Sequence, residues 1–414
     1  MSVLACKGGT PVIDPKEYKR APWPPVDMET AEMLKDLYLS GKWSFNSEME
    51  QKFEQEFSEY HNAEYAVFMA NGTVTLECAL QALGVRPGDE VIVPGLTWIA
   101  TAMAVHYVGA IPVFADIEED TLCLSPEAFE KAITPKTRVV IPVHLYGSMA
   151  NLDRIIEIAD AHNIAVLEDC AHMQGGKWRG KGAGSWGAIG SFSFQQSKTL
   201  TSGEGGICIT NDLELSDRLY RAKHIGYSRL DPQGAAKSAP PADLICHNYR
   251  GLAFPALLLS QQLKHLPARI ERMNKFVAEL KVLEDIPGIR LQAPGKEASP
   301  QGYYALEIIF DPAIWGKAFA PAVALQHEGI PISSGNYGPV YKHMLFNCKN
   351  YRNTGCPVSE FVGEQGASFA HAGMEYPEMV PVIEKAFRKV YEHRGELCSA
   401  SQFGTNSGMN RPNL

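Results

Sequence analysis

Short apolar runs alternate with longer segments of helical spacing between about residue 65 and residue 170. The apolar runs have the length of strands, and most are apolar at consecutive positions rather than at every second one. Strands that are apolar on both faces are typical of a parallel sheet covered by helices on both sides. The pattern predicts strands over 65–70, 89–95, 111–117, 137–147 and 164–170, and helices over 72–85, 97–109, 125–133 and 152–163.

The segments on either side of this alternation follow other patterns. Two helices are expected first, over 28–41 and 47–61, with Ser47 as the N-cap of the second. Two close strands, 187–194 and 205–212, then flank a loop that is rich in glycine. The stretch 228–247 is rich in proline and alanine and has no period, which predicts a long surface loop.

The last third of the chain predicts a smaller α+β unit after a long connecting helix. The expected elements are a helix over 266–286, a strand over 303–310, and helices over 318–329 and 379–393. We therefore expect an α/β protein with the following parts: an irregular segment 1–25, a large domain 26–268, a small C-terminal domain 269–397, and a polar, disordered tail 398–414.

Composition narrows the class of protein. The 414 residues are 45% hydrophobic and carry a formal net charge of −9, which argues against a general nucleic-acid or anionic-membrane surface. There is no apolar run long enough to span a membrane, and the first residues lack the pattern of a signal peptide. The nine scattered cysteines form no CxxC pair, so we expect no metal site and a reducing, cytoplasmic location.

Several polar residues follow the predicted strands, where α/β proteins bind their ligands. Gly72 and Thr73 lie at the start of a predicted helix, whose free N–H groups suit a phosphate, although a plain strand–turn–helix corner is the simpler interpretation. Trp98 follows the next strand and is either a stacking face for a flat ring or a core side chain.

Two acids and a lysine complete the set. Glu168 and Asp169 close an apolar strand, and one of them is expected to face a positive group unless both are exposed at the strand end. Lys198 lies in the glycine-rich loop, near Ser193, where it is either a buried nucleophilic amine or an exposed loop side chain. A phosphate corner, a flat aromatic ring, an acid and an amine are together what pyridoxal phosphate requires.

At these motifs the chain resembles the DegT/DnrJ/EryC1/StrS family of sugar aminotransferases, from about Pro22 to about Arg394. The motifs are "NGTVTLECAL", "GDEVIVPGLTWIATA", "PVHLYGSMANLD", "EDCAH" and "SFSFQQSKTLTSGEGG". Within the family they are most similar to the glutamine:scyllo-inosose and 2-deoxy-scyllo-inosose aminotransferases. The resemblance implies the type I fold of PLP-dependent transferases, with a mostly parallel seven-stranded sheet in the large domain.

The resemblance also implies a role for each motif residue. Lys198 would form the Schiff base with the cofactor and shuttle the proton, and Asp169 would hold the pyridinium nitrogen charged. Trp98 would stack on the ring, and His172 would lie near the phenolic oxygen. The phosphate would be bound by Gly72, Thr73 and Ser193, and by Asn248 of a neighbouring subunit, which implies a homodimer with shared active sites.

The implied reaction is ping-pong: glutamine or glutamate gives its amine to the cofactor, which then aminates a keto group of a cyclitol or sugar. One segment departs from the family pattern, because Ala253 and Pro255 stand where relatives commonly carry Glu and Gln. This segment lies near the substrate mouth in relatives. The candidate substrate contacts are Tyr146, Tyr337 and Lys342.

Four other interpretations remain open from the residues. A keto sugar phosphate or a nucleotide-linked keto sugar could replace the cyclitol as acceptor. A PLP-dependent dehydratase of this family would carry His in place of Lys198, and a protein that only binds sugars would need neither Lys198 nor Asp169. A nucleotide-binding protein would need a phosphate loop, but the lysine here precedes the glycines rather than following them.

Overall fold

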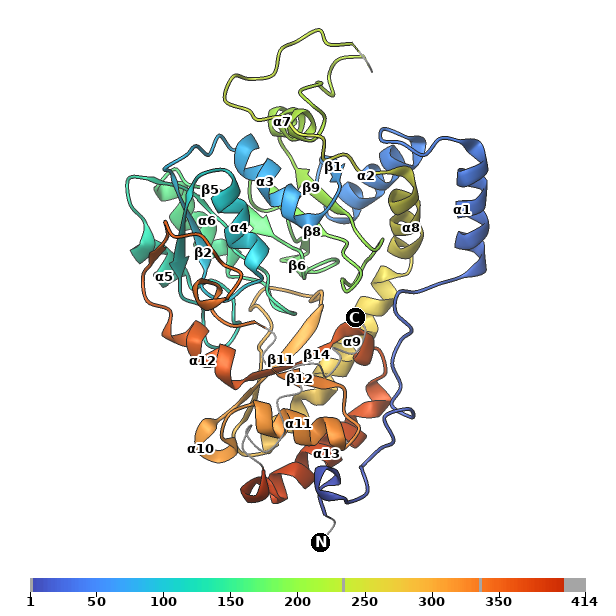
Figure 1. The fold of residues 1–414 in the computed structure, drawn as a ribbon, viewed down its shortest axis with the longest axis vertical. Helices are drawn as coiled ribbons and strands as arrows, with labels where there is room; N and C mark the ends of the chain where they lie inside the picture. The colour runs from blue at the N-terminus through green and yellow to red at the C-terminus, as the bar shows by residue number, and fades with distance from the viewer. Residues whose placement is uncertain (1–2, 233–234, 335–336, 398–414) are drawn as a thin grey trace.

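The chain is built around one large sheet, seen in the upper half of Figure 1. A computed structural model describes residues 3–232, 235–334 and 337–397, so the predicted tail 398–414 lies outside the described residues. The sheet has the strand order β1-β9-β8-β5-β4-β2-β3-β13. Its strands are β1 (Tyr65–Met69), β2 (Glu90–Pro94), β3 (Ile111–Ala115), β4 (Thr137–Val140), β5 (Ala165–Asp169), β8 (Ile189–Ser193), β9 (Gly206–Thr210) and β13 (Arg352–Asn353).

Most neighbouring strands in this sheet run parallel, as predicted. The pairs β8–β5, β5–β4, β4–β2, β2–β3 and β3–β13 are parallel, whereas β9 is antiparallel to both β1 and β8. The expected number of seven strands was wrong, because the sheet has eight. The additional strand, β13, is two residues long and comes from the C-terminal third of the chain, so no apolar run marks it.

Helices cover both faces of the sheet, which explains why its strands are apolar throughout. Val91 and Val93 of β2 pack in one cluster with α3 (Gly72–Ala82), α4 (Ile99–Tyr107) and α7 (Leu213–Lys223). Ile92, between them, packs in another cluster with α5 (Pro126–Ala132) and α6 (Leu152–Ala161). Successive side chains of a strand point to opposite faces, so each face has its own core.

The two N-terminal helices begin where the sequence predicts. The side chain of Asp27 accepts a hydrogen bond from the Thr30 N–H at the start of α1 (Met28–Ser40). The Ser47 hydroxyl accepts from the Glu50 N–H at the start of α2 (Glu48–Tyr60), which confirms Ser47 as the N-cap. Only α2 packs deeply: Phe53 and Phe57 are fully buried, and α1 has no buried residue.

A second, antiparallel sheet lies below the first in Figure 1, with the order β10-β11-β14-β12. It consists of β10 (Ile289–Leu291), β11 (Ala305–Phe310), β14 (Gly366–Ala370) and β12 (Ile332–Ser334), and it packs with α11 (Phe319–His327) and α13 (Val380–Glu392). The helices α8 (Ala253–Leu263) and α9 (Leu266–Leu280) connect the two sheets (Figure 1). One hydrophobic cluster includes side chains from both, so the division at residue 268 stays a prediction.

The expected loop over 228–247 has no helix or strand among its described residues and extends beyond α7 (Figure 1). Both ends of the loop are tied to α7, because the Ser228 hydroxyl donates to Asp217 and Arg218 binds Asp243. Among the described residues, no helix is long and apolar enough to cross a membrane.

The aromatic contacts of Phe57 give a test of the core. Its ring lies 4.9 Å from that of Phe192 and 5.5 Å from that of Phe194, so α2 is packed directly on β8. We expect Phe57→Ala to lower the free energy of unfolding by about 3–5 kcal/mol, because the truncation leaves a cavity. Phe361→Ala is the control, since Phe361 is 42% exposed; it should change stability by less than about 0.5 kcal/mol in urea unfolding. Equal effects of the two substitutions would contradict this packing.

Candidate active site

The topology brings most of the predicted site residues to one edge of the large sheet. β5 ends at Asp169 and β8, its parallel neighbour, ends at Ser193. α3 begins at Gly72, and Trp98 is the N-cap residue of α4, just beyond β2. Lys198 lies in the connection between β8 and β9.

Asp169 is a buried carboxylate with two donors. Its Oδ2 accepts a hydrogen bond of 2.8 Å from the Thr101 hydroxyl, and its Oδ1 accepts one of 3.1 Å from the Ala171 N–H. Burial raises the pKa of Asp169, and the bonds from Thr101 and Ala171 and the charge of Lys198 oppose that rise only in part. The carboxylate is therefore held in an environment that calls for a nearby positive partner.

Lys198 is also buried, so the interpretation as an exposed loop lysine was wrong. Its Nζ lies 4.6 Å from the centroid of the Tyr304 ring. Burial lowers the pKa of Lys198, while Tyr304 and Asp169 raise it by less. A lysine that loses its proton more easily is a better nucleophile toward carbonyl groups.

The ring of His172 also contacts Tyr304. The two rings stack with centroids 3.9 Å apart, and the Tyr146 N–H donates to Nδ1 of His172 at 3.3 Å. Burial, followed by the charge of Lys198, holds the pKa of His172 well below its usual range. Because Nδ1 accepts, the single proton of the neutral ring is on Nε2, where it can be donated to an oxygen.

The predicted phosphate corner brings Gly72, Thr73 and Ser193 together. A Cβ on Gly72 would lie 2.5 Å from the Cβ of Ser193, so only glycine allows this approach. The side chain of Asn71 already accepts from the N–H groups of Thr73 and Val74. A phosphate at this corner would therefore be bound by hydroxyl groups and by those N–H groups that do not already donate to the Asn71 side chain.

Three of the remaining candidates are aromatic residues whose rings lie in a row, and the other two are Lys342 and Asn248. Tyr337 lies 5.7 Å from Trp98 and stacks at 5.4 Å on Tyr146, and Trp98 is 45% exposed, so it is not a core side chain. Lys342 forms a 2.8 Å ion pair with Glu360, and its side chain is exposed. Asn248 is exposed and pairs with His224 through the backbone.

Glu168 turns away from the site, although it is the neighbour of Asp169. Both acids are buried, so the interpretation as exposed strand-end carboxylates was wrong. Burial alone would raise the pKa of Glu168, but hydrogen bonds from His144 and from the N–H groups of Gly187 and Gly184 outweigh it and lower that pKa. Glu168 thus fixes the loop after β7 (Lys181–Gly182) to the end of β5.

Two further residues complete the site and were not predicted from the sequence. Thr101 stands one helical turn after Trp98, and that spacing could have suggested a hydroxyl facing the same edge. Tyr304 precedes β11 in the second sheet, and no local pattern connects it with Lys198. Its place depends on how the two sheets pack.

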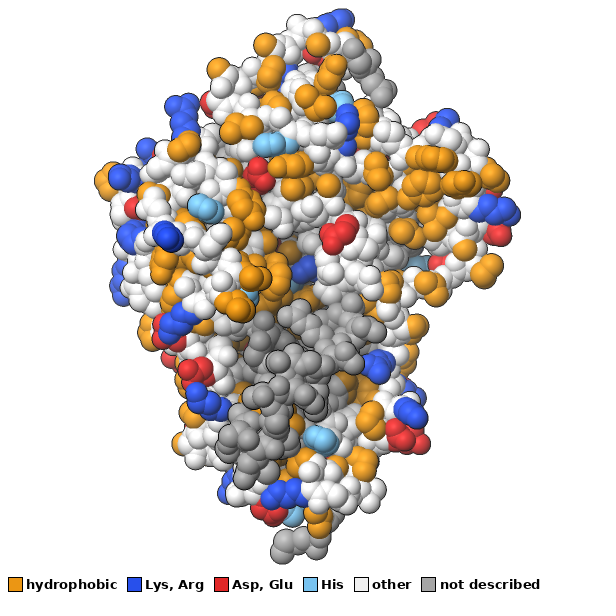
Figure 2. Space-filling view, viewed as in Figure 1, with side chains coloured by type: hydrophobic (Ala, Val, Ile, Leu, Met, Phe, Trp, Pro, Cys, Tyr) orange, Lys and Arg blue, Asp and Glu red, His pale blue; other side chains and the backbone are white. Residues whose placement is uncertain are grey.

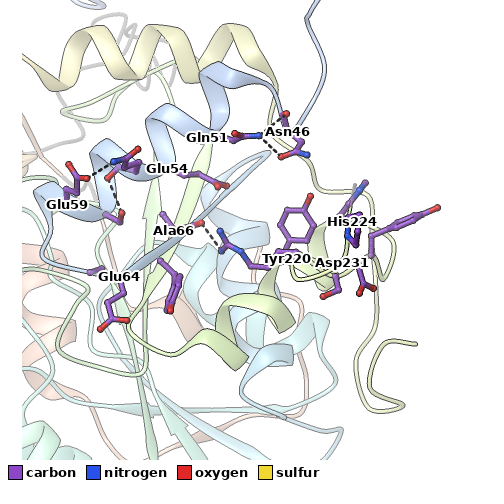
Figure 3. A pocket seen from close by; sticks show the side chains of 17 residues that line it. Asn46, Gln51, Glu54, Glu59, Glu64, Ala66, Tyr220, His224 and Asp231 are labelled. Atoms are coloured by element: carbon purple, nitrogen blue, oxygen red, sulfur yellow. Dashed lines mark hydrogen bonds between the residues drawn. The ribbon is translucent and has the colours of Figure 1, made fainter. Parts of the chain in front are cut away.

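One surface pocket, of about 480 Å³, lies elsewhere (Figure 3). It is formed by α2, the start of β1, α7 and the beginning of the long loop, and it contains none of the predicted site residues. Its polar side chains largely bind one another, as Gln51 with Asn46 and Gln55 with Glu59. We therefore do not assign the site to this pocket.

The hydrogen bond from Thr101 to Asp169 can be tested by stability. Thr101→Val keeps the shape but removes the donor, which should cost about 1.5–3 kcal/mol while the carboxylate is charged. The pKa of Asp169 is already raised in the folded state, so its contribution to stability falls as the pH rises. The variant raises that pKa further, and its loss of stability should be larger at pH 8 than at pH 5.

The measurement is urea unfolding of cofactor-free protein at both pH values. Thr97→Val is the matched control, because Thr97 reaches Asp169 only through its 3.1 Å contact with Thr101. A loss of stability in Thr101→Val that is the same at both pH values would contradict the assignment.

Comparison with known proteins agrees with this geometry. A family model described as the DegT/DnrJ/EryC1/StrS aminotransferase family matches residues 25–385. The L-glutamine:2-deoxy-scyllo-inosose aminotransferase of Streptomyces kanamyceticus is 36% identical over 433 residues, covering 96% of this chain and 99% of its own. The protein of the same name from Micromonospora echinospora is 34% identical, covering 96% and 100%.

Solved structures with the same fold include 3-amino-5-hydroxybenzoic acid synthase, with a TM-score of 0.82 and 27% identity over 91% of this chain and 99% of that chain. DesV of S. venezuelae has a TM-score of 0.80 and 30% identity over 90% and 99%. The buried amine, the buried acid and the glycine-lined corner fit pyridoxal phosphate as the cofactor of this chain. The chain belongs to the DegT/DnrJ/EryC1/StrS aminotransferase family and is a PLP-dependent aminotransferase.

Proposed function

We propose that this aminotransferase moves an amine from L-glutamine or L-glutamate to a keto group of a cyclitol or simple sugar of the scyllo-inosose type, in aminocyclitol biosynthesis. The single observation that carries the chemistry is the buried Lys198, whose Nζ lies against Tyr304 and within the field of Asp169. The substrate class is supported by the names of relatives that match nearly the whole chain.

Each site residue has a definite task in this proposal. Pyridoxal phosphate, when bound, supplies a ring that accepts the electron pair left when an amino acid loses its α-proton. Asp169 keeps the ring nitrogen protonated, since a buried carboxylate favours a cation beside it. Lys198 would hold the cofactor through its Nζ, and the same amine would carry the α-proton of the amino acid. His172 donates from Nε2 to an oxygen of the cofactor.

The same proposal places the other candidates around this centre. Gly72, Thr73 and Ser193 bind the phosphate, and Trp98 forms a stacking face at the mouth of the site. Tyr146 and Tyr337 are proposed as substrate contacts; Tyr146 has φ of +58°, an unusual conformation for a residue other than glycine. Lys342 could reach a substrate only by leaving its ion pair with Glu360.

We propose that the active unit is a homodimer, with Asn248 completing the partner's phosphate site. The helix α1 supports this: it has no buried residue, and Figure 2 shows apolar side chains at the upper right, where α1 and α8 lie. Tyr38, Leu39, Trp43 and Leu252 are each between 45% and 70% exposed there. An apolar patch of this kind is typical of an interface. Seven of the described cysteines, Cys78, Cys123, Cys170, Cys208, Cys246, Cys348 and Cys356, are free thiols, which supports a cytoplasmic location.

An absorbance spectrum tests the donor half of the reaction. We expect the purified protein to carry a yellow band from the covalent link to pyridoxal phosphate, and L-glutamine or L-glutamate alone to bleach it, since ping-pong chemistry needs no second substrate. Borohydride reduction followed by peptide mapping should place the cofactor on Lys198. A label on another lysine would contradict the assignment, and a yellow band untouched by either donor would contradict the proposed donor class.

The bleached enzyme then identifies the acceptor. Each candidate ketone is added in turn, and return of the yellow band reports amine transfer. A scyllo-inosose-type cyclitol should restore it, whereas a keto sugar phosphate or a nucleotide-linked keto sugar should not. Restoration by one of the latter alone would replace the cyclitol in the proposal.

The shared site can be tested by mixing two inactive variants. Lys198→Ala lacks the amine of its own site, and Asn248→Ala lacks the residue given to the partner's site. A mixed dimer has one site with both defects and one intact site, so equal mixing should restore about a quarter of the wild-type activity. Activity that remains at zero after subunit exchange, verified by mass, would show that the sites are not shared in this way.

A further inference from the structure

Three backbone carbonyls beside Lys198 accept hydrogen bonds from three distant parts of the chain. The indole N–H of Trp23 donates to Gln196 O at 2.6 Å. Nε2 of His371 pairs with Ser197 O at 3.0 Å. Nη1 of Arg269 donates to Thr199 O at 2.7 Å. Side chains from the N-terminal segment, from α9 and from the turn after β14 therefore hold the loop on both sides of the lysine.

The three donors also hold one another. The guanidinium of Arg269 lies 4.2 Å from the ring centroid of Trp23, and its Nη2 is 3.3 Å from Nδ1 of His371. Trp23 meets His371 edge to face at 4.6 Å. The carboxylate of Glu375 binds Arg269 through Nε at 2.8 Å and so fixes the direction of the guanidinium. Arg269, His371, Trp23 and Glu375 thus form one unit, which we call the loop clamp.

The protonation state of His371 is fixed by its neighbours. Since Arg269 can only donate, Nδ1 of His371 accepts, and the proton of the neutral ring is on Nε2, facing Ser197 O. Burial and then the charge of Arg269 lower the pKa of His371 to about 3. His371 therefore remains a neutral donor to the loop at any pH at which the protein works.

The loop clamp also connects with the ring that Lys198 faces. The backbone N–H of His371 donates to the backbone oxygen of Tyr304 at 3.0 Å. The Tyr304 hydroxyl is 3.2 Å from the hydroxyl of Ser197. The clamp therefore fixes the main chain of Lys198 and the position of Tyr304 in one frame.

We propose that Arg269, His371 and Trp23 are positioning residues that hold the main chain around Lys198 so that its Nζ stays against the ring of Tyr304. None of them touches the reacting atoms, and they act through the loop. The inference rests on the proposed function of Lys198 as the residue that binds the cofactor covalently. A misplacement of about 1 Å at a reacting group can cost about 100-fold in rate.

Arg269→Met tests the inference, and Arg272→Met is its matched control. Arg272 binds the same carboxylate of Glu375, at 2.6 Å, but makes no hydrogen bond or ion pair to the loop within the described part of the chain. We expect L-glutamine to bleach the yellow band of Arg269→Met at least about tenfold more slowly than that of the wild type. The L-glutamine concentration that gives half the maximal rate should stay within about threefold of the wild-type value. The pH at the midpoint of the band's titration should shift. Arg272→Met should behave as wild type in all three.

Two milder substitutions keep the proposal testable if Arg269→Met does not fold. Trp23→Phe removes the N–H donor but keeps a ring over Arg269. His371→Gln retains an N–H at the position of Nε2, whereas His371→Ala does not, so His371→Gln should recover most of the rate and the band titration that His371→Ala loses.

The outcomes separate this inference from the proposed function. A wild-type protein with no yellow band on Lys198 would overturn both. The loop clamp alone would be overturned if the wild type shows the band and three folded variants match it in rate and band titration. These variants are Arg269→Met, His371→Ala and Trp23→Phe. Equal defects in Arg269→Met and Arg272→Met would assign the effect to Glu375 rather than to the loop.

Discussion

The structure depends on burying an amine and a carboxylate close to each other. Burial pushes the pKa of Lys198 down and that of Asp169 up, so each group is driven toward its neutral form. Such burial is costly unless partners are supplied. Tyr304 faces the amine, and Thr101 and Ala171 donate to the carboxylate. Asp169 still needs a positively charged partner, and Lys198 still needs a carbonyl group to react with. A bound pyridoxal phosphate would provide both, through its ring nitrogen and its aldehyde.

Two sheets are needed to build this environment. The large parallel sheet delivers Asp169, His172 and the glycine corner at the ends of its strands, which is where the fold places ligands. It cannot by itself cover Lys198. The second part of the chain contributes Tyr304 just before β11 and His371 just after β14, while α9 contributes Arg269. The two parts pack in one hydrophobic cluster, and this packing is therefore needed to assemble the active site as well as to stabilise the fold.

Much of the fold could be predicted because local patterns decide it. The strands β1 to β5 are apolar on both faces, and Asp27 and Ser47 cap their helices through their own side chains. Asp169 and Lys198 were predicted because an acid or amine after an apolar strand is conspicuous. β13, with two residues, has no such pattern, which is why the sheet has eight strands and not seven. Thr101 was missed although its position one helical turn after Trp98 could have suggested it. Tyr304 and the loop clamp could not be predicted, since their roles arise only from contacts between segments far apart in the chain, such as Trp23 with Arg269.

The most direct test of the central claim is the reactivity of the buried amine itself. Cofactor-free protein is mixed with pyridoxal phosphate over a range of pH, the product is trapped with borohydride, and the rate of labelling at Lys198 is followed by mass spectrometry. Because burial lowers the pKa of Lys198, the labelling rate should rise with pH to a plateau. The midpoint of that rise should lie at a pH clearly below the ordinary lysine pKa of about 10.4. A midpoint at or above that value would mean that Lys198 is not held as an easily deprotonated amine, and it would contradict the role assigned to this side chain.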